Sequence, residues 1–218
     1  MFVVTTPATD RLLLSSAQMR AAAGLADDDA SQDAALAVLN ARISSEICSA
    51  CNIAIASDGR EPTLRQETLT ETFRGLADDA LILSRRHNVE IVSVAVDGVA
   101  LDSGSYEIDA GAGLLYRLRD DRLCCWVGYK AVVVYRAGFA AVPPDLIGAA
   151  SDLIRFRRSE LERDPLARSE RVKTEGVDEV AVEYWVNAVT SGAGSMSGSA
   201  IPANVAAALS RFMNPRCG

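Results

Sequence analysis

The residues that decide the fold are Ala131-Val132-Val133-Val134-Tyr135-Arg136-Ala137-Gly138-Phe139-Ala140-Ala141-Val142-Pro143-Pro144-Asp145-Leu146. The first five are rich in β-branched side chains and predict a strand. Pro143-Pro144-Asp145 predicts the first turn of a helix, because proline fits there and an acidic side chain favours the positive end of the helix dipole. The chain therefore changes here from strand to helix.

The helix that follows is predicted to be amphipathic and to end at Asp164-Pro165. We expect its buried side to consist of Leu146, Ala149, Ala150, Leu153, Ile154 and Phe156. Its opposite side carries the densest basic cluster of the chain, which is Arg155, Arg157, Arg158 and Arg163. Two interpretations of this cluster stay open. It is either a solvated surface balanced by nearby glutamates, or a contact with another subunit or partner, where arginine pairs well with carboxylates.

Upstream of the join, residues 66–140 predict a β-rich region. Val89 to Val96 has the β-branched composition of a strand, and the Asp97-Gly98 pair that follows is a favoured two-residue hairpin turn. Shorter strands are predicted at Thr68–Phe73, Tyr106–Asp109, Leu114–Leu118 and Ala131–Tyr135. Their close spacing predicts a compact antiparallel sheet or a small barrel.

Two helices are predicted before this region. The first begins at Ser15 or Ser16, and Gly24 suits its C-terminal end. Asp27-Asp28-Asp29 places negative charge where we expect the second helix to begin. This helix runs to about Cys51, and its buried face is predicted from four apolar positions: Leu36, Leu39, Ile43 and Ile47.

Downstream of the join, the pattern becomes weaker. Val180 to Val189 contains Tyr184 and Trp185 and predicts a short strand or an arm, and Ser191 to Ser199 has the composition of a flexible Gly/Ser linker. Pro202 is predicted to begin a last helix that runs to about Met213. One side of that helix carries Val205, Leu209 and Phe212.

The predicted fold class is α+β, with a helical bundle framework, an inserted antiparallel β domain and a flexible C-terminal arm that ends in a helix. We divide the chain into an N-terminal helical part (1–65), the β-rich domain (66–140) and the long helix that completes the framework (141–165). The mobile arm, the linker and the terminal helix occupy residues 166–218.

The composition bounds the class of protein. With 218 residues and 49% hydrophobic content, the chain is long enough for a core without disulfides or metals. Its net charge of −7 argues against stable nucleic-acid binding, which favours a basic surface. No stretch approaches the roughly 20 apolar residues of a membrane span, and the N-terminus resembles no secretion signal. We therefore expect a cytosolic origin.

The chain offers few groups for catalysis or metal binding. His87 is the single histidine, which excludes a zinc site built on several histidines. We predict that His87 is a solvated loop residue. The five cysteines are expected to be reduced. Cys48 and Cys51 lie near a helix end, and Cys124 and Cys125 are adjacent in a strand, so all four are predicted to be buried apolar side chains. We therefore predict no catalytic residue, no cofactor and no metal site.

The order of these parts resembles the head–tail connector (neck adaptor) proteins of tailed bacteriophages and gene transfer agents. The most specific signal is Tyr135-Arg136-Ala137-Gly138-Phe139 followed by Val142-Pro143-Pro144-Asp145-Leu146. It is similar to a Y-x-A-G-[YF] … [VI]-P-x-[DE]-[LI] passage that leads into a helix in many phage neck proteins. Further resemblance lies in the helix pair and its surroundings, in the β region and at the C-terminal ending: Asp29–Cys51, Glu90–Gly98, Tyr106–Tyr116, Ile201-Pro202 and Asn214-Pro215-Arg216.

The resemblance implies a non-enzymatic subunit of a ring, usually of twelve copies. Such a ring docks under the portal protein, continues the DNA channel, and provides the platform for a stopper or tail-completion protein. Genomic DNA passes through the lumen without specific binding, and no membrane is involved. The resemblance places the protein in the virion neck after synthesis in the host bacterial cytoplasm, with the segment Ser191–Gly218 reaching the portal.

The candidate interface residues are Arg155, Arg157, Arg158, Tyr184, Trp185, Ile201, Phe212 and Arg216.

Besides the connector ring, a second hypothesis for the function is a tail-completion or stopper protein of the same neck region. The third is a small-ligand-binding or enzymatic β-barrel module, which would need a deep polar pocket around His87, Asp97 or Glu107. The copy number, the face that meets the portal, the tail type and the choice between phage and gene transfer agent stay open.

Overall fold

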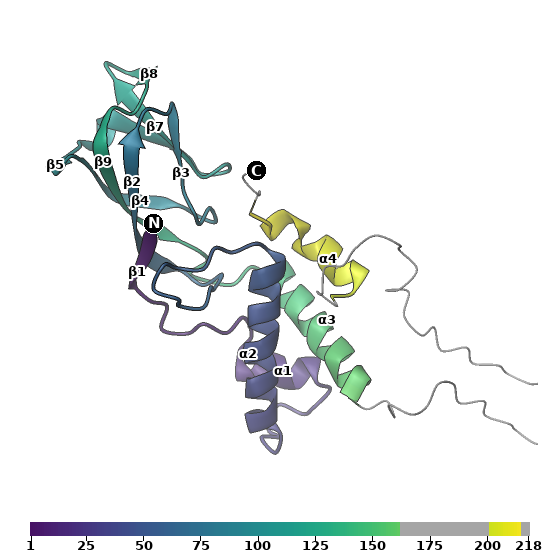
Figure 1. Cartoon of the computed structure of the whole chain (residues 1–218). Coiled ribbons are helices and arrows are strands. Elements are labelled where there is room, and N and C mark those ends of the chain that lie inside the picture. Colours follow the sequence, from purple (N-terminus) through teal and green to yellow (C-terminus); the bar gives the residue numbers. More distant parts are fainter. Residues whose placement is uncertain (162–200, 215–218) are drawn as a thin grey trace, which may run out of the picture.

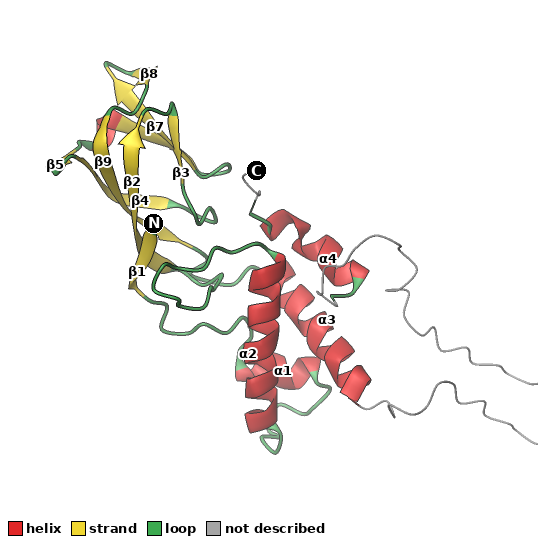
Figure 2. Cartoon of the chain, viewed as in Figure 1, coloured by secondary structure: helices red, strands yellow, loops and turns green. Residues whose placement is uncertain are grey.

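The structure is a computed structural model that describes residues 1–161 and 201–214. It has an α+β fold in which every strand pair of the two sheets is antiparallel. The helices lie at one end of the molecule and the strands at the other (Figures 1 and 2). The predicted fold class is therefore confirmed at this level.

The larger sheet has five strands in the order β1-β2-β9-β4-β5. These strands are β1 (Phe2–Thr6), β2 (Glu67–Leu76), β9 (Gly128–Ala137), β4 (Glu90–Val96) and β5 (Val99–Ala100). The long central pair of β2 and β9 runs in register from Glu67 opposite Ala137 to Leu76 opposite Gly128. The Asp97-Gly98 turn between β4 and β5 is confirmed, and both residues have the positive φ that such a turn requires.

The smaller sheet has the order β3-β7-β6, and β8 also pairs with β7. Its strands are β3 (Ala80–Ile82), β7 (Leu114–Arg119), β6 (Tyr106–Asp109) and β8 (Arg122–Cys124), with a 3₁₀ turn, η1 (Ser103–Ser105), before β6. Residues from both sheets, among them Leu69, Tyr135 and Leu115, belong to one buried core with Trp126. The prediction of one sheet or a small barrel is therefore corrected to two sheets around a common core.

Strands β1 and β3 were not predicted. β1 belongs to the larger sheet, although it lies in the segment 1–65 that the sequence pattern assigned to the helical part. Its partner β2 begins some 60 residues later, and a short β-branched run gives no sign of so distant a pairing. The division of the chain at residues 65, 140 and 165 stays a prediction.

Within residues 1–161 and 201–214, four helices surround a second core. They are α1 (Ser16–Ala22), α2 (Asp33–Ala50), α3 (Pro144–Leu161) and α4 (Ala203–Leu209), and α4 continues into a 3₁₀ turn, η2 (Ser210–Phe212). α1 begins with a capping box, in which Ser15 accepts from the Gln18 amide and the Gln18 side chain accepts from the Ser15 amide. The predicted apolar side of α3 is confirmed, with Leu146, Ala149, Ala150, Leu153 and Ile154 buried and Phe156 half-buried.

The start of α2 differs from the prediction. The helix begins at Asp33, and Asp27-Asp28-Asp29 lies in the loop before it. The Asp29 carboxylate accepts a hydrogen bond from the Ser31 amide at 3.0 Å, a local turn that competes with helix formation. Arg20 of α1 pairs with Asp33, so the position of the first turn is set by a contact with another helix. The predicted end of α3 at Asp164-Pro165 lies outside the described residues.

At the join between β9 and α3, contacts with other segments of main chain fix the conformation of the chain. Gly138 is buried with φ +104°, and a Cβ atom there would overlap the main-chain carbonyl of Arg65. Its amide donates to the His87 carbonyl at 2.7 Å, and the Phe139 amide donates to the Leu64 carbonyl at 2.8 Å. A glycine is therefore needed where three segments of main chain meet between the sheets and the helices.

A buried charged network lies beside this join. Arg85, in the connection from β3 to β4, donates from Nη1 to Glu67 Oε2 of β2 at 2.6 Å, and both side chains are almost fully buried. The same nitrogen also donates to the Thr63 carbonyl at 3.3 Å. The Arg85 guanidinium lies 5.9 Å from the centre of the Phe2 ring of β1. The ion pair therefore joins β1, β2 and the β3–β4 connection.

A second carboxylate, that of Glu71, completes the network. It accepts hydrogen bonds from the Tyr135 hydroxyl at 2.9 Å, from the Ser84 amide at 3.0 Å, and from the Ser84 hydroxyl. The Tyr135 hydroxyl in turn accepts from the Arg85 amide at 3.4 Å. Burial and the nearby Glu71 carboxylate both raise the pKa of Tyr135, so the phenol remains a hydrogen-bond donor.

We predict that Gly138→Ala destabilises the protein by about 3 kcal/mol or more, because the new methyl group has no room and alanine is strained at positive φ. Gly148→Ala is the matched control. Gly148 lies inside α3 with open space around its Cβ position, so this change should stabilise the protein by up to about 1 kcal/mol. Urea unfolding measures both, and equal stability of the two variants would contradict the assignment of Gly138.

We predict that Arg85→Met and Glu67→Met each lower the free energy of unfolding by about 3–5 kcal/mol, because each leaves a buried charge without its partner. The double variant should lose clearly less than the two single losses combined. Glu90→Gln, which breaks the exposed pair with Arg136, should change stability by less than about 1 kcal/mol. Additive losses in the double-mutant cycle would show that Arg85 and Glu67 act independently.

Candidate assembly interfaces

Of the predicted basic cluster, Arg163 lies outside the described residues, and the other three arginines form two groups. Arg157 donates to Glu46 of α2 at 2.9 Å and its side chain is 13% exposed, while Arg158 donates to the Ala23 carbonyl at the end of α1 at 2.5 Å. These two arginines therefore hold α3 against its neighbouring helices. Arg155 is different, because its side chain is 61% exposed and pairs within α3 with Asp152. Of these three, Arg155 is the one that faces solvent.

The two C-terminal candidates that the structure describes pack against the helical core. Ile201 is half-buried, and Phe212 is 4% exposed. The Phe212 ring meets Phe139 edge-on at 5.8 Å, and the Arg211 guanidinium lies 5.1 Å from its centre. The pocket around Phe212 is thus supplied by this chain itself. Whether either residue contacts a partner stays a prediction, and Tyr184, Trp185 and Arg216 lie outside the described residues.

The sequence predicted that His87 is a solvated loop residue, and this prediction is wrong. The ring is half-buried and lies 5.6 Å from the Phe139 ring. Burial lowers the pKa of His87, and a hydrogen bond to the Phe212 main chain opposes that shift. The polar neighbours of His87 in the sequence indicated exposure to solvent. The β3–β4 connection is instead covered by Phe139 and Phe212, which come much later in the chain.

The last described residues close over the boundary between helices and sheets. The Asn214 amide donates to the Cys51 carbonyl at 2.8 Å, at the end of α2. Its side-chain nitrogen lies 3.4 Å from the Ser84 carbonyl of the β3–β4 connection. Residues 212–214 therefore touch both parts of the molecule.

The cysteine prediction is confirmed for one pair and wrong for the other. Cys48 and Cys51 are buried in the helical core, and burial raises their pKa values to about 11 and about 12, which suppresses the reactive thiolate. Cys125 is exposed, and its thiol donates to Asp79 at 3.0 Å, while Cys124 is half-buried. β8 has one strand partner, β7, so its end stays accessible.

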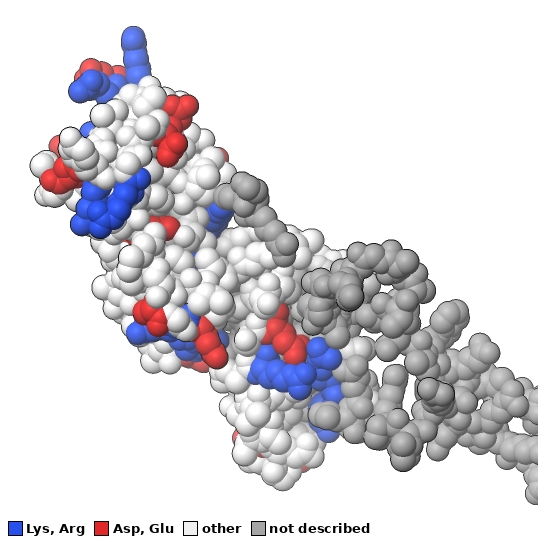
Figure 3. All heavy atoms as spheres, viewed as in Figure 1, with Lys and Arg blue, Asp and Glu red and all other residues white. Residues whose placement is uncertain are grey.

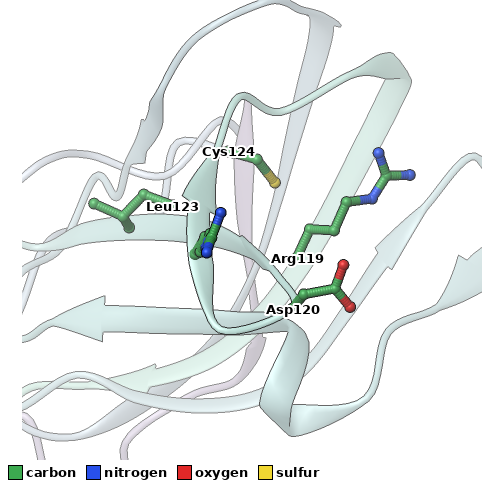
Figure 4. A pocket seen from close by; sticks show the side chains of 5 residues that line it. Arg119, Asp120, Leu123 and Cys124 are labelled. Atoms are coloured by element: carbon green, nitrogen blue, oxygen red, sulfur yellow. The ribbon is translucent and has the colours of Figure 1, made fainter.

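The surface hollow in Figure 4 lies at the turn between β7 and β8. Its lining residues are Arg119, Asp120, Arg122, Leu123 and Cys124. Arg119, Asp120 and Cys124 lie together there, whereas Leu123 points away from them (Figure 4). The hollow is open to solvent and does not include His87, Asp97 or Glu107, the positions at which a catalytic module would need a polar pocket.

Two further searches cover residues 1–161 and 201–214. No group of three or more histidine, cysteine, aspartate or glutamate side chains there has an arrangement that could hold a metal ion. In the same part of the chain, no helix combines the length and the apolar composition that crossing a membrane requires.

The charged side chains on the face shown in Figure 3 form small mixed groups. Basic and acidic residues lie next to one another, and wide uncharged areas separate the groups. This face therefore lacks the continuous basic field that nucleic-acid binding favours.

Sequence reasoning missed two features. One is the buried network of Glu67, Glu71 and Arg85, in which Arg85 lies 18 residues after Glu67 and Tyr135 lies 64 residues after Glu71. The other is a set of strongly exposed apolar side chains on the β part: Val99, Leu123, Val127 and Tyr129. The signal for the second was present in the sequence, since Val127 and Tyr129 flank Gly128, just before the strand predicted at Ala131–Tyr135.

Comparisons with known proteins place the fold. No family model matches the chain, and no curated protein does. Two solved particles contain chains of similar structure at 19% sequence identity. One is the virion of a native gene transfer agent, with a TM-score of 0.54 over 100% of this chain and 97% of that chain. The other is the neck of an empty gene transfer agent particle computed with C6 symmetry, with a TM-score of 0.51 over 78% and 89%. The chain shares its fold with these two particle components.

Proposed function

We propose that the protein is a structural subunit of a virion neck, and that it forms the head–tail connector ring under the portal. The observation that carries this proposal is the fold similarity to a chain of a gene transfer agent virion, which extends over the whole of this chain. The second similar chain comes from a particle neck. Because one fold can serve many functions, ring formation and portal binding are the properties that distinguish this role from others.

The described surface is compatible with this role. A ring subunit needs no catalytic pocket, only two unlike surfaces that meet head to tail and close. We propose twelve copies, a number that a six-fold axis such as that of the neck particle accommodates. The framework of helices would then hold the β part as an inserted domain in each copy.

The net charge of −7 supports a passive role toward DNA. In this proposal the ring continues the DNA channel, and an acidic lumen keeps the packaged genome from binding to the wall. The ring would dock to the portal protein and offer its other side to a stopper or tail-completion protein. No cofactor and no bond-making step is part of this role.

A tail-completion or stopper protein of the same neck region is the alternative function. The similarity to a chain of a whole virion fits either position in the particle. The two roles differ in what they bind, because the connector ring binds the portal directly and a stopper binds the connector.

The proposal assigns Arg155 to the contact between neighbouring copies. Its exposed guanidinium can reach a carboxylate of another subunit, while Arg157 and Arg158 already hold α3 in place. We therefore propose the solvent-facing side of α3 as one contact between copies, among the residues that the structure describes.

We predict that the purified protein forms a ring of about 280 kDa, which is twelve times the 23.2 kDa chain mass. Mass photometry over a range of concentrations, with and without the neighbouring portal protein, measures the mass and its change on binding. A stable 23.2 kDa monomer at every concentration that ignores the portal would end the proposal. Binding to a connector but not to the portal would favour the stopper role.

We predict that Arg155→Glu raises the concentration needed for ring assembly by about tenfold, because it replaces an attraction across the contact by repulsion. The melting temperature should stay close to that of the unchanged protein, since the Arg155 side chain is 61% exposed and its ion pair is with Asp152 of the same helix. Arg157→Met should instead lower the melting temperature, because it removes the contact with Glu46. Arg136→Met, at an exposed arginine of β9, serves as the control. Unchanged assembly of Arg155→Glu would remove Arg155 from the interface.

A further inference from the structure

An exposed apolar cluster lies where β9 begins. Tyr129 is 88% exposed, Val127 is 78% exposed, and Val99 of the neighbouring hairpin is 67% exposed. We call these three residues the β tip. β9 begins at the end of the β part that lies away from the helices and ends at the join with α3 (Figure 1). The β tip is therefore presented at the far end of the molecule.

The main chain of the β tip is held by one carboxylate. Asp97, in the turn between β4 and β5, accepts from the Tyr129 amide at 3.0 Å and from the Lys130 amide at 2.8 Å. A Cβ atom on Gly128 would approach Asp97 Oδ2 to 2.8 Å and Val96 Cγ1 to 2.9 Å, so a side chain there would displace these two groups, and the φ of +146° would strain it further. These contacts connect Tyr129 to the hairpin that carries Val99 and fix the main chain of both.

The tyrosine itself contributes little to the core. Side chains two positions apart lie on the same side of a strand, so Tyr129 continues the row of Ala131, Val133 and Tyr135. Those three are fully buried, whereas Tyr129 extends beyond the core into solvent. A rigidly held main chain below an exposed tyrosine lowers the entropy lost on binding, which is a property of binding anchors.

The small size of the β tip indicates which kind of partner it fits. Its three side chains expose on the order of 400 Å², and a stable pairwise interface buries about 800 Å² on each partner. One β tip is therefore too small to hold two molecules together. In a ring, many identical tips face the same way, and weak contacts made at once add up to strong binding.

We propose that the β tip is the contact through which the ring binds the next neck protein, with Tyr129 and Val127 entering an apolar hollow on each copy of that partner. The partner is a second ring-forming protein of another sequence, because its repeated hollows must match the repeated tips. This inference rests on the proposed ring function. For the contact with the next neck protein, it names the residues, their apolar chemistry and the many copies that bind at once.

The test combines Tyr129→Asp with Val127→Ser in a strain that produces the particle. Both side chains lie outside the core, so the melting temperature and the ring mass of the variant should equal those of the unchanged protein. The count of heads joined to tails in electron micrographs should fall at least about tenfold, because the loss is repeated in every copy. Val38→Asp, at a 72% exposed residue of α2, is the matched control and should leave the count unchanged.

A separate variant tests the role of the clamp. Asp97→Ala frees the amides of Tyr129 and Lys130, so hydrogen exchange at these two amides should become faster and tail joining should fall less than in the double variant. Asp97→Asn keeps an acceptor oxygen and tolerates positive φ, and should restore most of the joining.

Each outcome identifies which proposal fails. Normal tail joining by a double variant that forms rings overturns the inference about the β tip and leaves the ring function standing. A double variant that loses its ring mass also overturns it, because the β tip then lies between copies of this chain. Absence of any ring in the unchanged protein overturns the ring function, and the inference that rests on it.

Discussion

The structure depends on how three charged side chains are buried together where the sheets meet the helices. Glu67 and Glu71 lie on the same side of β2, and both turn toward the interior. Transfer of a carboxylate from water is unfavourable unless hydrogen bonds and an opposite charge replace the lost hydration. Arg85 supplies the charge for Glu67, and Tyr135 with Ser84 supplies hydrogen bonds for Glu71. A shift of β2 by one residue would leave both carboxylates without these partners, so the network specifies the register of the central pair.

The same requirement shows what sequence alone reveals. The strand-to-helix join was predictable because its signals are local: β-branched residues, then two prolines and an aspartate. The alternation of β2 was also predictable, because Thr68, Thr70 and Thr72 alternate with Leu69, Glu71 and Phe73, but the burial of Glu67 and Glu71 was not. Glu67 and Glu71 resemble solvent-facing residues until Arg85 is known to meet them, and Arg85 itself stands in a polar stretch, Ser84-Arg85-Arg86-His87-Asn88. Long-range partners gave that stretch its burial, and neither composition nor periodicity encodes them.

The basic cluster of α3 gives a similar lesson about interfaces. The sequence left two interpretations open, a solvated surface or a contact with another molecule. Arg157 and Arg158 follow neither, because they tie α3 to α2 and α1 within the same chain. Arginine suits such contacts, since its planar donors satisfy a carboxylate or a carbonyl while its stem packs against apolar residues. Residue type alone thus indicated that these arginines bind carboxylates or carbonyls, but the packing of the helices was needed to identify those partners as groups of the same chain.

The C-terminal segment meets a constraint that follows from the same packing. Family resemblance assigns Ser191–Gly218 to contact with a portal, yet Val205, Leu209 and Phe212 are already buried against the helices of this chain. Detaching α4 to offer these side chains to a portal would expose them and remove the contact of Asn214 with Cys51. Each buried apolar side chain contributes on the order of 2 kcal/mol, so detachment opposes binding by several kcal/mol. A contact that keeps α4 in place uses the other side of α4 and η2, where Ala203, Ala207 and Arg211 face solvent. That arrangement also leaves Asn214 in place, where it contacts Cys51 at the end of α2 and Ser84 of the β3–β4 connection and so joins the helices to the β part.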